Sequence, residues 1–566
     1  MLVSAPDRYQ RGSIRSIIMA AKFQDAFVIT ILFLFSIISS TVALAVPAIT
    51  PYAPTTATCP TTGLVRPATG ISSSESSYIS SRKAKADIAL TAWLKKQFNT
   101  TFPASPLPQV GLTVSGGGYR ALLEGAGVLQ ALDSRDSNSS VSGLYQGLTY
   151  QAGLSGGGWL LSSIAGNNFP TISTLRDSLW EDSFSGSLFA PGGISLEAAP
   201  TYVAVTADVA AKEAAGYLTT ITDPYGRLLS HQLLQGTDGG VATRLSSITG
   251  FSNFTSFLAP YPILTALGVK LSTGQCTPAN NATQYEFHPY EFGSWDTGVS
   301  AFTRTDFLGS RLSNGVPIVP GVCTQNYDNL GYILGTSSNV FNVLCISAPN
   351  FPPDDVLDRL EAIVDTLHAL STRDQYATYP NPFYRYNQST LVSGDVELTL
   401  ADGGENKQNN PVWPFIQPAR SVGVLIVNDN SDNTDDNFPD GSDLYNTYVR
   451  AQAAGLTKMP VIPPPATFAS AGLLTRATFF GCDDNSKLTI VYLPNRQYTY
   501  DSGQSTAKLQ YSAEETDKMI ANGNKIVTQG DDNSWPTCLA CAIVMKTGGT
   551  LPSACADCFS KYCYRQ

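Results

Sequence analysis

The chain has 566 residues, which is long enough to bury a large core, and 43% of them are hydrophobic. Only 14% are charged, and the formal net charge is −10 at pH 7. This acidic balance argues against a nucleic-acid partner, because a phosphate backbone requires a basic surface.

The amino terminus carries the first recognisable segment, a secretory leader. Residues 26–45 form an apolar run that ends in Ala-Leu-Ala, a small-residue cleavage pattern, and basic residues precede it. The run is also near the minimum length for a membrane span, so a signal anchor is the alternative. Serines and a threonine in its second half favour cleavage. We therefore predict a signal peptide over residues 1–45, with Met19 as an alternative start. The protein would be secreted, and its association with a cell wall is left open.

Ten cysteines, an even number, follow the leader. In an oxidising compartment they should pair as disulfides. Half of them lie near the end of the chain, at Cys538, Cys541, Cys555, Cys558 and Cys563. The two Cys-x-x-Cys pairs resemble a zinc ribbon, but the loop between them is short for a ribbon, so we expect disulfides and no metal. Because this group is odd in number, at least one member must pair outside it or stay free.

Five N-glycosylation sequons are consistent with the same secretory route. Their asparagines are Asn99, Asn138, Asn253, Asn281 and Asn387. Serine and threonine are abundant in this chain, so some sequons arise by chance.

Along the rest of the chain, strand-like runs alternate with helical patterns. Residues 46–75 are rich in proline, threonine and serine and predict an extended lead-in. From Ser81 onward, apolar residues recur at helical spacing. A further helix is expected over residues 121–132, and strands over 110–114, 148–152, 396–401, 422–427 and 488–493. Strands interleaved with helices indicate an α/β fold.

The stretch GLSGGGW, which contains Ser155, is typical of the nucleophile turn of a serine hydrolase. The serine would lie between a strand and a helix, with its hydroxyl exposed at the helix N-terminus. Its small neighbours would let a substrate carbonyl approach. Glycine-flanked serines are also common in ordinary loops, so the pattern alone leaves both interpretations open.

A second glycine-rich turn, SGGGYR, follows the strand expected over residues 110–114 and opens a helix. Consecutive glycines such as Gly117 and Gly118 leave backbone N–H groups free to point at one spot, as an oxyanion hole requires. Arg120 follows and could hold a phosphate through two parallel hydrogen bonds. A nucleotide-binding loop is the rival interpretation, but the turn lacks both a Lys-Ser/Thr pair and GxGxxG spacing.

A third turn places Asp402 before two glycines, at the end of a predicted strand. On its own it is most simply a turn aspartate, the most frequent role of Asp-Gly. The acidic run of residues 429–443 invites a calcium-loop interpretation, but it lacks the spacing of an EF-hand and predicts a solvated loop.

Four motifs together resemble one family closely. They are SGGGYRALLEGAG, GLSGGGW, EFGSWD at Glu291–Asp296 and DGGENKQNNPVWPFIQPAR at Asp402–Arg420. They are similar to fungal lysophospholipase, also called phospholipase B, whose catalytic core is shared with the cytosolic calcium-dependent phospholipases and, more distantly, with patatin. The resemblance implies an acyl-hydrolase core with a central mixed sheet flanked by helices. Residues 76–537 would be the catalytic domain, and 538–566 a cysteine-rich appendix packed on it.

The resemblance also implies roles for the site residues. Ser155 would be the nucleophile and Asp402 its base, while Gly117 and Gly118 would supply oxyanion N–H groups. Arg120 would steady the phosphate or the intermediate. No metal or cofactor is expected, and the substrates would be lysophospholipids and diacyl phospholipids at a micelle or membrane surface.

A Ser–Asp dyad would explain the scarcity of histidine. The chain has only His231, His288 and His368, and none lies in a recognisable motif. A carboxylate has an intrinsic pKa of about 4, so we expect activity to persist into acid, where histidine would be protonated.

Two alternatives stay open. A neutral-lipid or galactolipid esterase would leave the phosphate role of Arg120 idle. A catalytically inactive cell-wall glycoprotein could have kept the same fold. The chain ends without an apolar tail and is therefore expected to lack a GPI signal.

Overall fold

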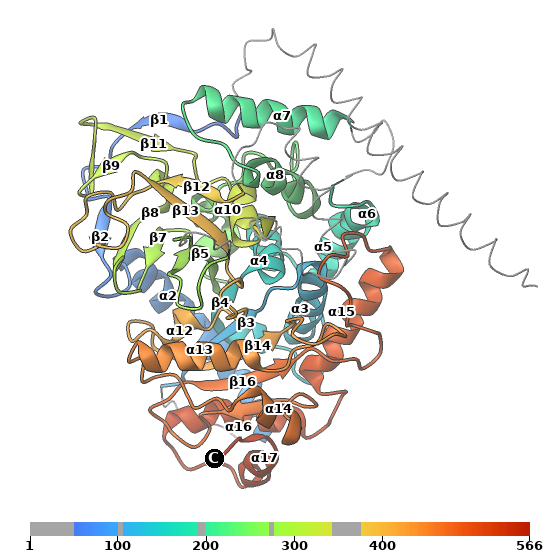
Figure 1. Ribbon diagram of the computed structural model, residues 1–566. Coiled ribbons are helices and arrows are strands. Elements are labelled where there is room, and N and C mark those ends of the chain that lie inside the picture. Colours follow the sequence, from blue (N-terminus) through green and yellow to red (C-terminus); the bar gives the residue numbers. More distant parts are fainter. Residues whose placement is uncertain (1–49, 100–105, 190–198, 271–276, 342–374, 566) are drawn as a thin grey trace, which may run out of the picture.

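The computed structural model describes residues 50–99, 106–189, 199–270, 277–341 and 375–565 (Figure 1). The leader predicted over residues 1–45, with Met19, lies outside these ranges, as do Cys276, Cys345 and His368. Within the described ranges, no helix combines the length and the apolar character that a membrane span requires.

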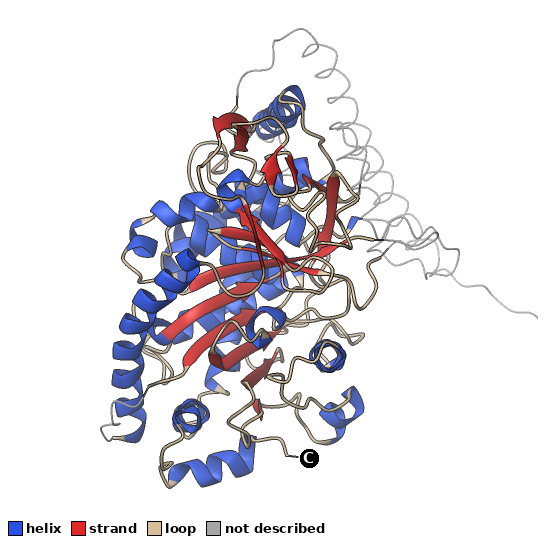
Figure 2. Ribbon diagram, turned by 90° about the vertical axis from the view of Figure 1, so that its left-hand side faces the viewer, coloured by secondary structure: helices blue, strands red, loops and turns tan. Residues whose placement is uncertain are grey.

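A mixed β-sheet runs through the centre of the molecule, and Figure 2 shows helices on either side of it. The strands lie in the order β15 (Thr478–Phe480), β16 (Thr489–Pro494), β14 (Val422–Asp429), β3 (Gln109–Val114), β4 (Leu148–Gly153), β5 (Tyr261–Gly268), β6 (Gln284–Phe287), β7 (Glu291–Ser294), β8 (Ala301–Arg304) and β2 (Val65–Pro67). Strands β16 to β5 run parallel, whereas β15 and the strands from β6 to β2 are antiparallel to their neighbours. This confirms the predicted α/β class with a central mixed sheet.

Strand β13 (Glu397–Asp402) also belongs to this sheet. It lies beside β5, in line with β4, so that the two strands meet end to end. Strand β5 pairs through Leu264 with Gly153, the last residue of β4, and through Ala266 with Asp402, the last residue of β13. Both partners lie on the same side of β5, because β6 pairs with these residues of β5 from the other side. Strand β4 runs parallel to β5 and β13 antiparallel, so the carboxyl ends of β4 and β13 meet.

Two helices begin at the carboxyl ends of parallel strands. Helix α3 (Gly118–Leu132) follows β3, and helix α4 (Ser155–Gly166) follows β4. Helix α15 (Ala513–Thr528) packs along α3, and helix α10 (Leu330–Ser337) packs against α4 and α8 (Thr222–Leu233). The two glycine-rich turns therefore lie at the same edge of the sheet.

The other described α-helices and strands surround this centre (Figure 1). The helices are α2 (Ser73–Phe98), α5 (Ile172–Leu175), α6 (Glu181–Ser185), α7 (Ala199–Ala214), α9 (Ser252–Thr255), α12 (Trp413–Ile416), α13 (Ser442–Ala453), α14 (Pro465–Ser470), α16 (Trp535–Val544) and α17 (Ala554–Tyr562). The strands are β1 (Thr55–Thr58), β9 (Leu312–Ser313), β10 (Val316–Pro317) and β11 (Val322–Gln325). Strand β12 (Ala377–Pro380) instead belongs to the central sheet, where it pairs antiparallel with β13.

The start of α2 differs from the sequence-based prediction. The helix begins at Ser73 rather than at Ser81. The Ser72 hydroxyl caps it by accepting a hydrogen bond from the Glu75 N–H at 3.1 Å. The first turns of the helix are polar, so apolar spacing did not reveal them.

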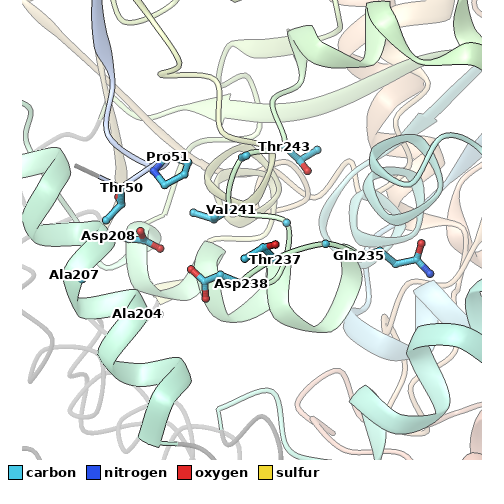
Figure 3. Close-up of a pocket in the computed structure, with 13 residues that line it drawn as sticks. Thr50, Pro51, Ala204, Ala207, Asp208, Gln235, Thr237, Asp238, Val241 and Thr243 are labelled. Carbon is cyan, nitrogen blue, oxygen red and sulfur yellow. The ribbon is translucent and has the colours of Figure 1, made fainter. Parts of the chain in front are cut away.

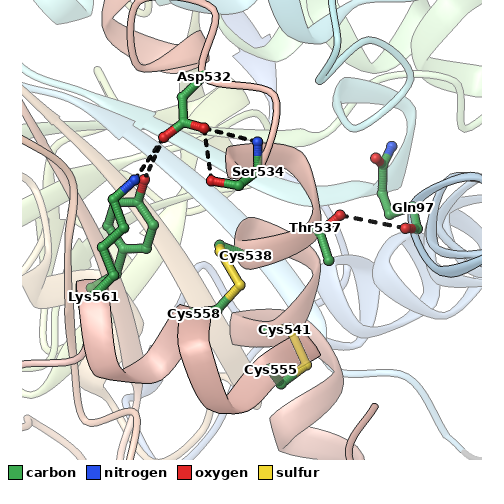
Figure 4. The surroundings of a disulfide bond; sticks show 10 residues. Gln97, Asp532, Ser534, Thr537, Cys538, Cys541, Cys555, Cys558 and Lys561 are labelled. Atoms are coloured by element: carbon green, nitrogen blue, oxygen red, sulfur yellow. Dashed lines mark hydrogen bonds and ion pairs between the residues drawn. A yellow bond between two sulfur atoms is a disulfide. The ribbon is translucent and has the colours of Figure 1, made fainter. Parts of the chain in front are cut away.

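Four disulfides lie in the described part of the chain. They are Cys59–Cys323, Cys482–Cys563, Cys538–Cys558 and Cys541–Cys555. Figure 4 shows the last two linking α16 to α17. The prediction of disulfides at the C-terminal cysteines is confirmed, and the cysteine that pairs outside the cluster is Cys563.

Candidate active site

Ser155 lies at a sharp turn between β4 and α4. Its backbone has φ of 48°, in the left-handed region that a non-glycine residue rarely adopts. The side chain is partly exposed, whereas the three glycines that follow it are buried. A strained turn at this position is the form expected of a nucleophile held at the start of a helix.

The turn that carries Gly117 and Gly118 packs against this serine turn. The two glycines have φ of 135° and 58°. A Cβ on Gly118 would lie 2.7 Å from the Thr506 carbonyl oxygen, and a Cβ on Gly156 would lie 2.1 Å from the Gly118 carbonyl oxygen. In the described chain, no acceptor takes the N–H groups of Gly117 and Gly118. These N–H groups are available for a ligand beside Ser155.

Arg120 lies behind this turn, with its side chain fully buried. Its Nε and Nη2 donate to the Asn430 carbonyl oxygen at 3.1 and 2.9 Å, and its Nη1 donates to the Gln504 carbonyl oxygen at 2.5 Å. The Asp432 carboxylate is 3.6 Å from Nη2. The guanidinium therefore fastens two loops to the glycine turn, with most of its donors in use.

Asp402 is brought to Ser155 by the meeting of β13 and β4. The side chain is 4% exposed, and its Oδ1 accepts the Gly404 N–H at 2.6 Å. Its Oδ2 is buried and has no hydrogen-bond partner in the described chain. The Ser155 hydroxyl is close enough to lower the pKa of this carboxyl, although no hydrogen bond of standard geometry joins the two side chains. A buried, unpaired carboxylate oxygen next to an exposed hydroxyl can take a proton from it.

The pKa of Asp402 differs from the expectation of about 4. Burial raises it from 3.8 to about 6, which outweighs the opposing effects of the Gly404 N–H and the Ser155 hydroxyl. The negative charge of Asp432 adds to the rise. If Asp402 is the base, it is protonated below about pH 6, so the pH profile of activity tests the expectation that activity persists into acid.

The end of α10 and the two residues after it hold both turns, and no motif of the sequence indicated them. The Ser337 hydroxyl accepts the Ser155 N–H at 3.2 Å and donates to the Thr265 carbonyl oxygen at 2.7 Å. Two residues later, the Asn339 carbonyl oxygen accepts the Asp402 N–H at 3.0 Å. Residues 337–339 thus fix the backbone of both candidate catalytic residues. The contact joins positions far apart in the chain, so no local pattern could have indicated it.

Asn409 connects the glycine turn to the turn after Asp402. Its Oδ1 accepts the Gly116 N–H at 3.1 Å, and its Nδ2 donates to the Ser431 hydroxyl at 2.9 Å. The Asp443 carboxylate accepts the Asn409 N–H at 2.9 Å. Asn409 belongs to the motif that starts at Asp402, but only the structure reveals this linking role.

The described histidines lie outside this arrangement. His288 is fully buried and follows β6, on the other side of β5 from Asp402 and roughly 14 Å away by strand spacings. Its Nδ1 shares a hydrogen bond of 2.6 Å with the Tyr261 hydroxyl, and burial lowers its pKa to about 4. His231 pairs with Asp238 at 3.1 Å, and burial likewise lowers its pKa to about 4. No described histidine is joined to Ser155 by a hydrogen bond.

The acidic run of residues 429–443 is more than a solvated loop. Its exposed carboxylates agree with that prediction, but its backbone packs on the site. The Asn430 N–H donates to the Ser115 hydroxyl at 2.6 Å, and the Asn430 carbonyl oxygen accepts from Arg120. The run thus forms part of the wall beside the glycine turn.

A separate cavity of about 480 Å³ lies between α7 and the turn over residues 235–243 (Figure 3). Asp208 and Asp238 line it, and both are already paired with the buried Arg227. None of the candidate catalytic residues lines this cavity. It therefore does not compete with Ser155 and Asp402 as the reactive centre.

Comparisons with known proteins identify the family and the fold. A family model described as the lysophospholipase catalytic domain matches residues 110–566. Lysophospholipase 2 of Aspergillus fumigatus is 39% identical over 551 residues, which cover 91% of this chain and 93% of that protein. The probable lysophospholipase 3 of Schizosaccharomyces pombe is 36% identical over 91% of this chain and 82% of that protein. Among solved structures, human GIVD cytosolic phospholipase A2 has the same fold, with a TM-score of 0.63 at 18% identity over 87% of this chain and 69% of that chain.

Proposed function

This chain belongs to the lysophospholipase family of ester hydrolases, and on that basis we propose that it acts as a secreted lysophospholipase or phospholipase B through a Ser155–Asp402 dyad. The substrates are fatty acyl esters of lysophospholipids, and of diacyl phospholipids too. One observation carries the proposal. The carboxyl ends of β4 and β13 meet on one side of β5, which brings the partly exposed Ser155 close to Asp402 and its buried, unpaired oxygen.

In the first step, Asp402 takes the proton of the Ser155 hydroxyl as its oxygen attacks the ester carbonyl. The oxyanion that forms is stabilised by the N–H groups of Gly117 and Gly118. Collapse of this intermediate breaks the ester bond, and Asp402 returns the proton to the departing glycerol oxygen. Water, activated by the same carboxylate, then hydrolyses the acyl-enzyme and regenerates Ser155.

Arg120 acts in this scheme by holding the oxyanion turn. The family resemblance implies one of two roles for it, on the phosphate or on the intermediate. Its burial and its bonds to the carbonyl oxygens of Asn430 and Gln504 favour the second, because few donors are left for a phosphate. Without these bonds, the glycine turn would lose its support from two neighbouring loops.

Secretion is supported by the disulfides, which form and persist in oxidising compartments. Four of the sequon asparagines, Asn99, Asn138, Asn281 and Asn387, are exposed. Asn253 is half-buried, and its side-chain nitrogen donates to the Asn168 carbonyl oxygen at 2.7 Å. We therefore propose glycosylation at the four exposed sites and expect Asn253 to be the poorest acceptor.

The test is turnover of lysophosphatidylcholine by the wild type and by Ser155→Ala. We expect the wild type to release fatty acid and the variant to lose activity by about a millionfold while it remains folded and secreted. Release of fatty acid only from neutral lipids or galactolipids would favour the esterase alternative. A folded wild type that is inactive on every ester would favour the inactive glycoprotein. Near-normal activity of Ser155→Ala would rule out the dyad.

A further inference from the structure

The candidate active site has an apolar side. Tyr225 lies near Asp402, because its hydroxyl donates to the Ser338 carbonyl oxygen at 3.3 Å and the next residue, Asn339, accepts the Asp402 N–H. The ring of Tyr225 packs edge-to-face on Phe341 at 4.9 Å and stacks on Phe189 at 6.4 Å. An acyl chain leaving Ser155 on this side would meet aromatic rings.

Another side of the site, beyond Gly118, is polar. The Thr506 carbonyl oxygen lies against Gly118, and the Thr506 hydroxyl donates to the Asp432 carboxylate. Both side chains are exposed to solvent. An ester whose acyl chain lay on the apolar side would have its glycerophosphate and head group on this polar side, towards Thr506 and Asp432.

Asp432 is the charged group that a substrate would meet on this side. Its side chain is 44% exposed, whereas Arg120, 3.6 Å behind it, is fully buried. The other cation nearby, Lys508, is paired with Glu515 at 2.6 Å. The charge of Asp432 reaches the reactive centre, since it contributes to the raised pKa of Asp402. Its carboxylate is thus exposed, close to the dyad and only partly neutralised.

We propose that Asp432 is a specificity-determining residue that favours substrates with a cationic head group, such as the quaternary ammonium of choline or the ammonium of ethanolamine. This inference rests on the proposed function. The head-group cation lies near the Asp432 carboxylate while the ester carbonyl lies at Ser155. A head group without a cation has no such partner, and an anionic one is repelled.

The experiment compares three lysophospholipids with the same acyl chain, carrying choline, ethanolamine or glycerol head groups, in neutral detergent micelles. The wild type is expected to show a higher kcat/KM for the first two. In Asp432→Asn, which keeps an acceptor for the Thr506 hydroxyl, the ratio of the choline to the glycerol substrate should fall about threefold to fivefold. Asp432→Glu should retain most of the preference because it keeps the charge.

Asp435→Asn is the matched control, since it removes an equal exposed charge from the same loop. A ratio that is unchanged in Asp432→Asn, or that falls equally in Asp435→Asn, would overturn the proposal. A nitrophenyl ester supplies a second measurement. Activity on this ester should rise with pH at an apparent pKa set by Asp402, and the charge of Asp432 raises that pKa. Asp432→Asn should therefore shift the rise in activity to lower pH. An unchanged pH profile would also contradict the proposal. A wild type inactive on all three lipids would instead refute the proposed function.

Discussion

The carboxyl group of Asp402 is buried, and one of its oxygens has no hydrogen-bond partner in the described chain. Burying the ionised carboxylate in this way lowers the stability of the folded protein. Burial raises its pKa from 3.8 to about 6, so the folded state binds the proton more tightly than the unfolded chain does. The stability that this protonation contributes is fully present below about pH 4 and is lost as the pH rises through about 6. In the proposed dyad the ionised form accepts the serine proton, so function and stability would oppose each other at this residue.

Asp402→Asn should therefore be more stable than the wild type at neutral pH. The raised pKa of Asp402 corresponds to a gain of up to about 3 kcal/mol in the free energy of unfolding of the variant, because one pKa unit equals about 1.4 kcal/mol. Thermal unfolding at pH 8 should show a higher Tm for the variant, and the difference should vanish at pH 4. The variant should also be nearly inactive, because an amide cannot accept the serine proton. A Tm difference of the same size at both pH values would mean that ionisation of Asp402 does not carry the cost.

At the scale of elements, the site depends on the carboxyl ends of β3, β4 and β13 and on the residues at the end of α10. Strands β3, β4, β13, β14 and β16 could be predicted because each is a short apolar run bounded by glycine or polar residues. The turns after β3 and β4 could be predicted too, because glycines follow both apolar runs. The meeting of β4 with β13 and the position of Ser337 could not be predicted, because both depend on pairing between distant parts of the chain. Asp402 was proposed as the base through family resemblance, since Asp-Gly alone indicates only a turn.

Ser337→Ala should impair catalysis without unfolding the protein. The variant loses the acceptor for the Ser155 N–H and the donor to the Thr265 carbonyl oxygen, so the strained serine turn can shift. A misplacement of about 1 Å costs about a hundredfold, so kcat should fall by about tenfold to a hundredfold with KM little changed. The rate at which a fluorophosphonate labels Ser155 should fall in parallel.

Ser389→Ala is the control, because the Ser389 hydroxyl is also fully buried and also donates to a backbone carbonyl oxygen, that of Val299. It should retain normal kcat and normal labelling. If both variants lost activity equally, the effect of Ser337 would be one of general stability and not of positioning.

At the scale of the whole molecule, the C-terminal cysteines belong to the main fold. The segment after α17 runs beside β15, where the Tyr564 N–H donates to the Phe479 carbonyl oxygen at 2.9 Å. The Cys482–Cys563 disulfide fastens this segment to the outer edge of the sheet. Residues Cys563 and Tyr564, near the end of the segment predicted as an appendix, thus extend the edge of the central sheet.

Replacing Cys482 and Cys563 together by serine should lower the free energy of unfolding by about 2–4 kcal/mol, because the disulfide restricts the unfolded chain. We expect a lower Tm in thermal unfolding and near-normal activity, since this edge of the sheet lies four strands from β4. An unchanged Tm would show that the link contributes nothing to stability.

The central claim is that Asp402, and not a histidine, activates Ser155. The most direct measurement is kcat/KM on lysophosphatidylcholine for a variant in which His231, His288 and His368 are all replaced by glutamine, beside Asp402→Asn. We predict that the folded triple variant keeps its activity within a few-fold and still gains activity as the pH rises through about 6, because that limb belongs to Asp402. Asp402→Asn should lose activity by at least about a thousandfold. A folded triple variant as inactive as Ser155→Ala, or an active Asp402→Asn, would contradict the dyad.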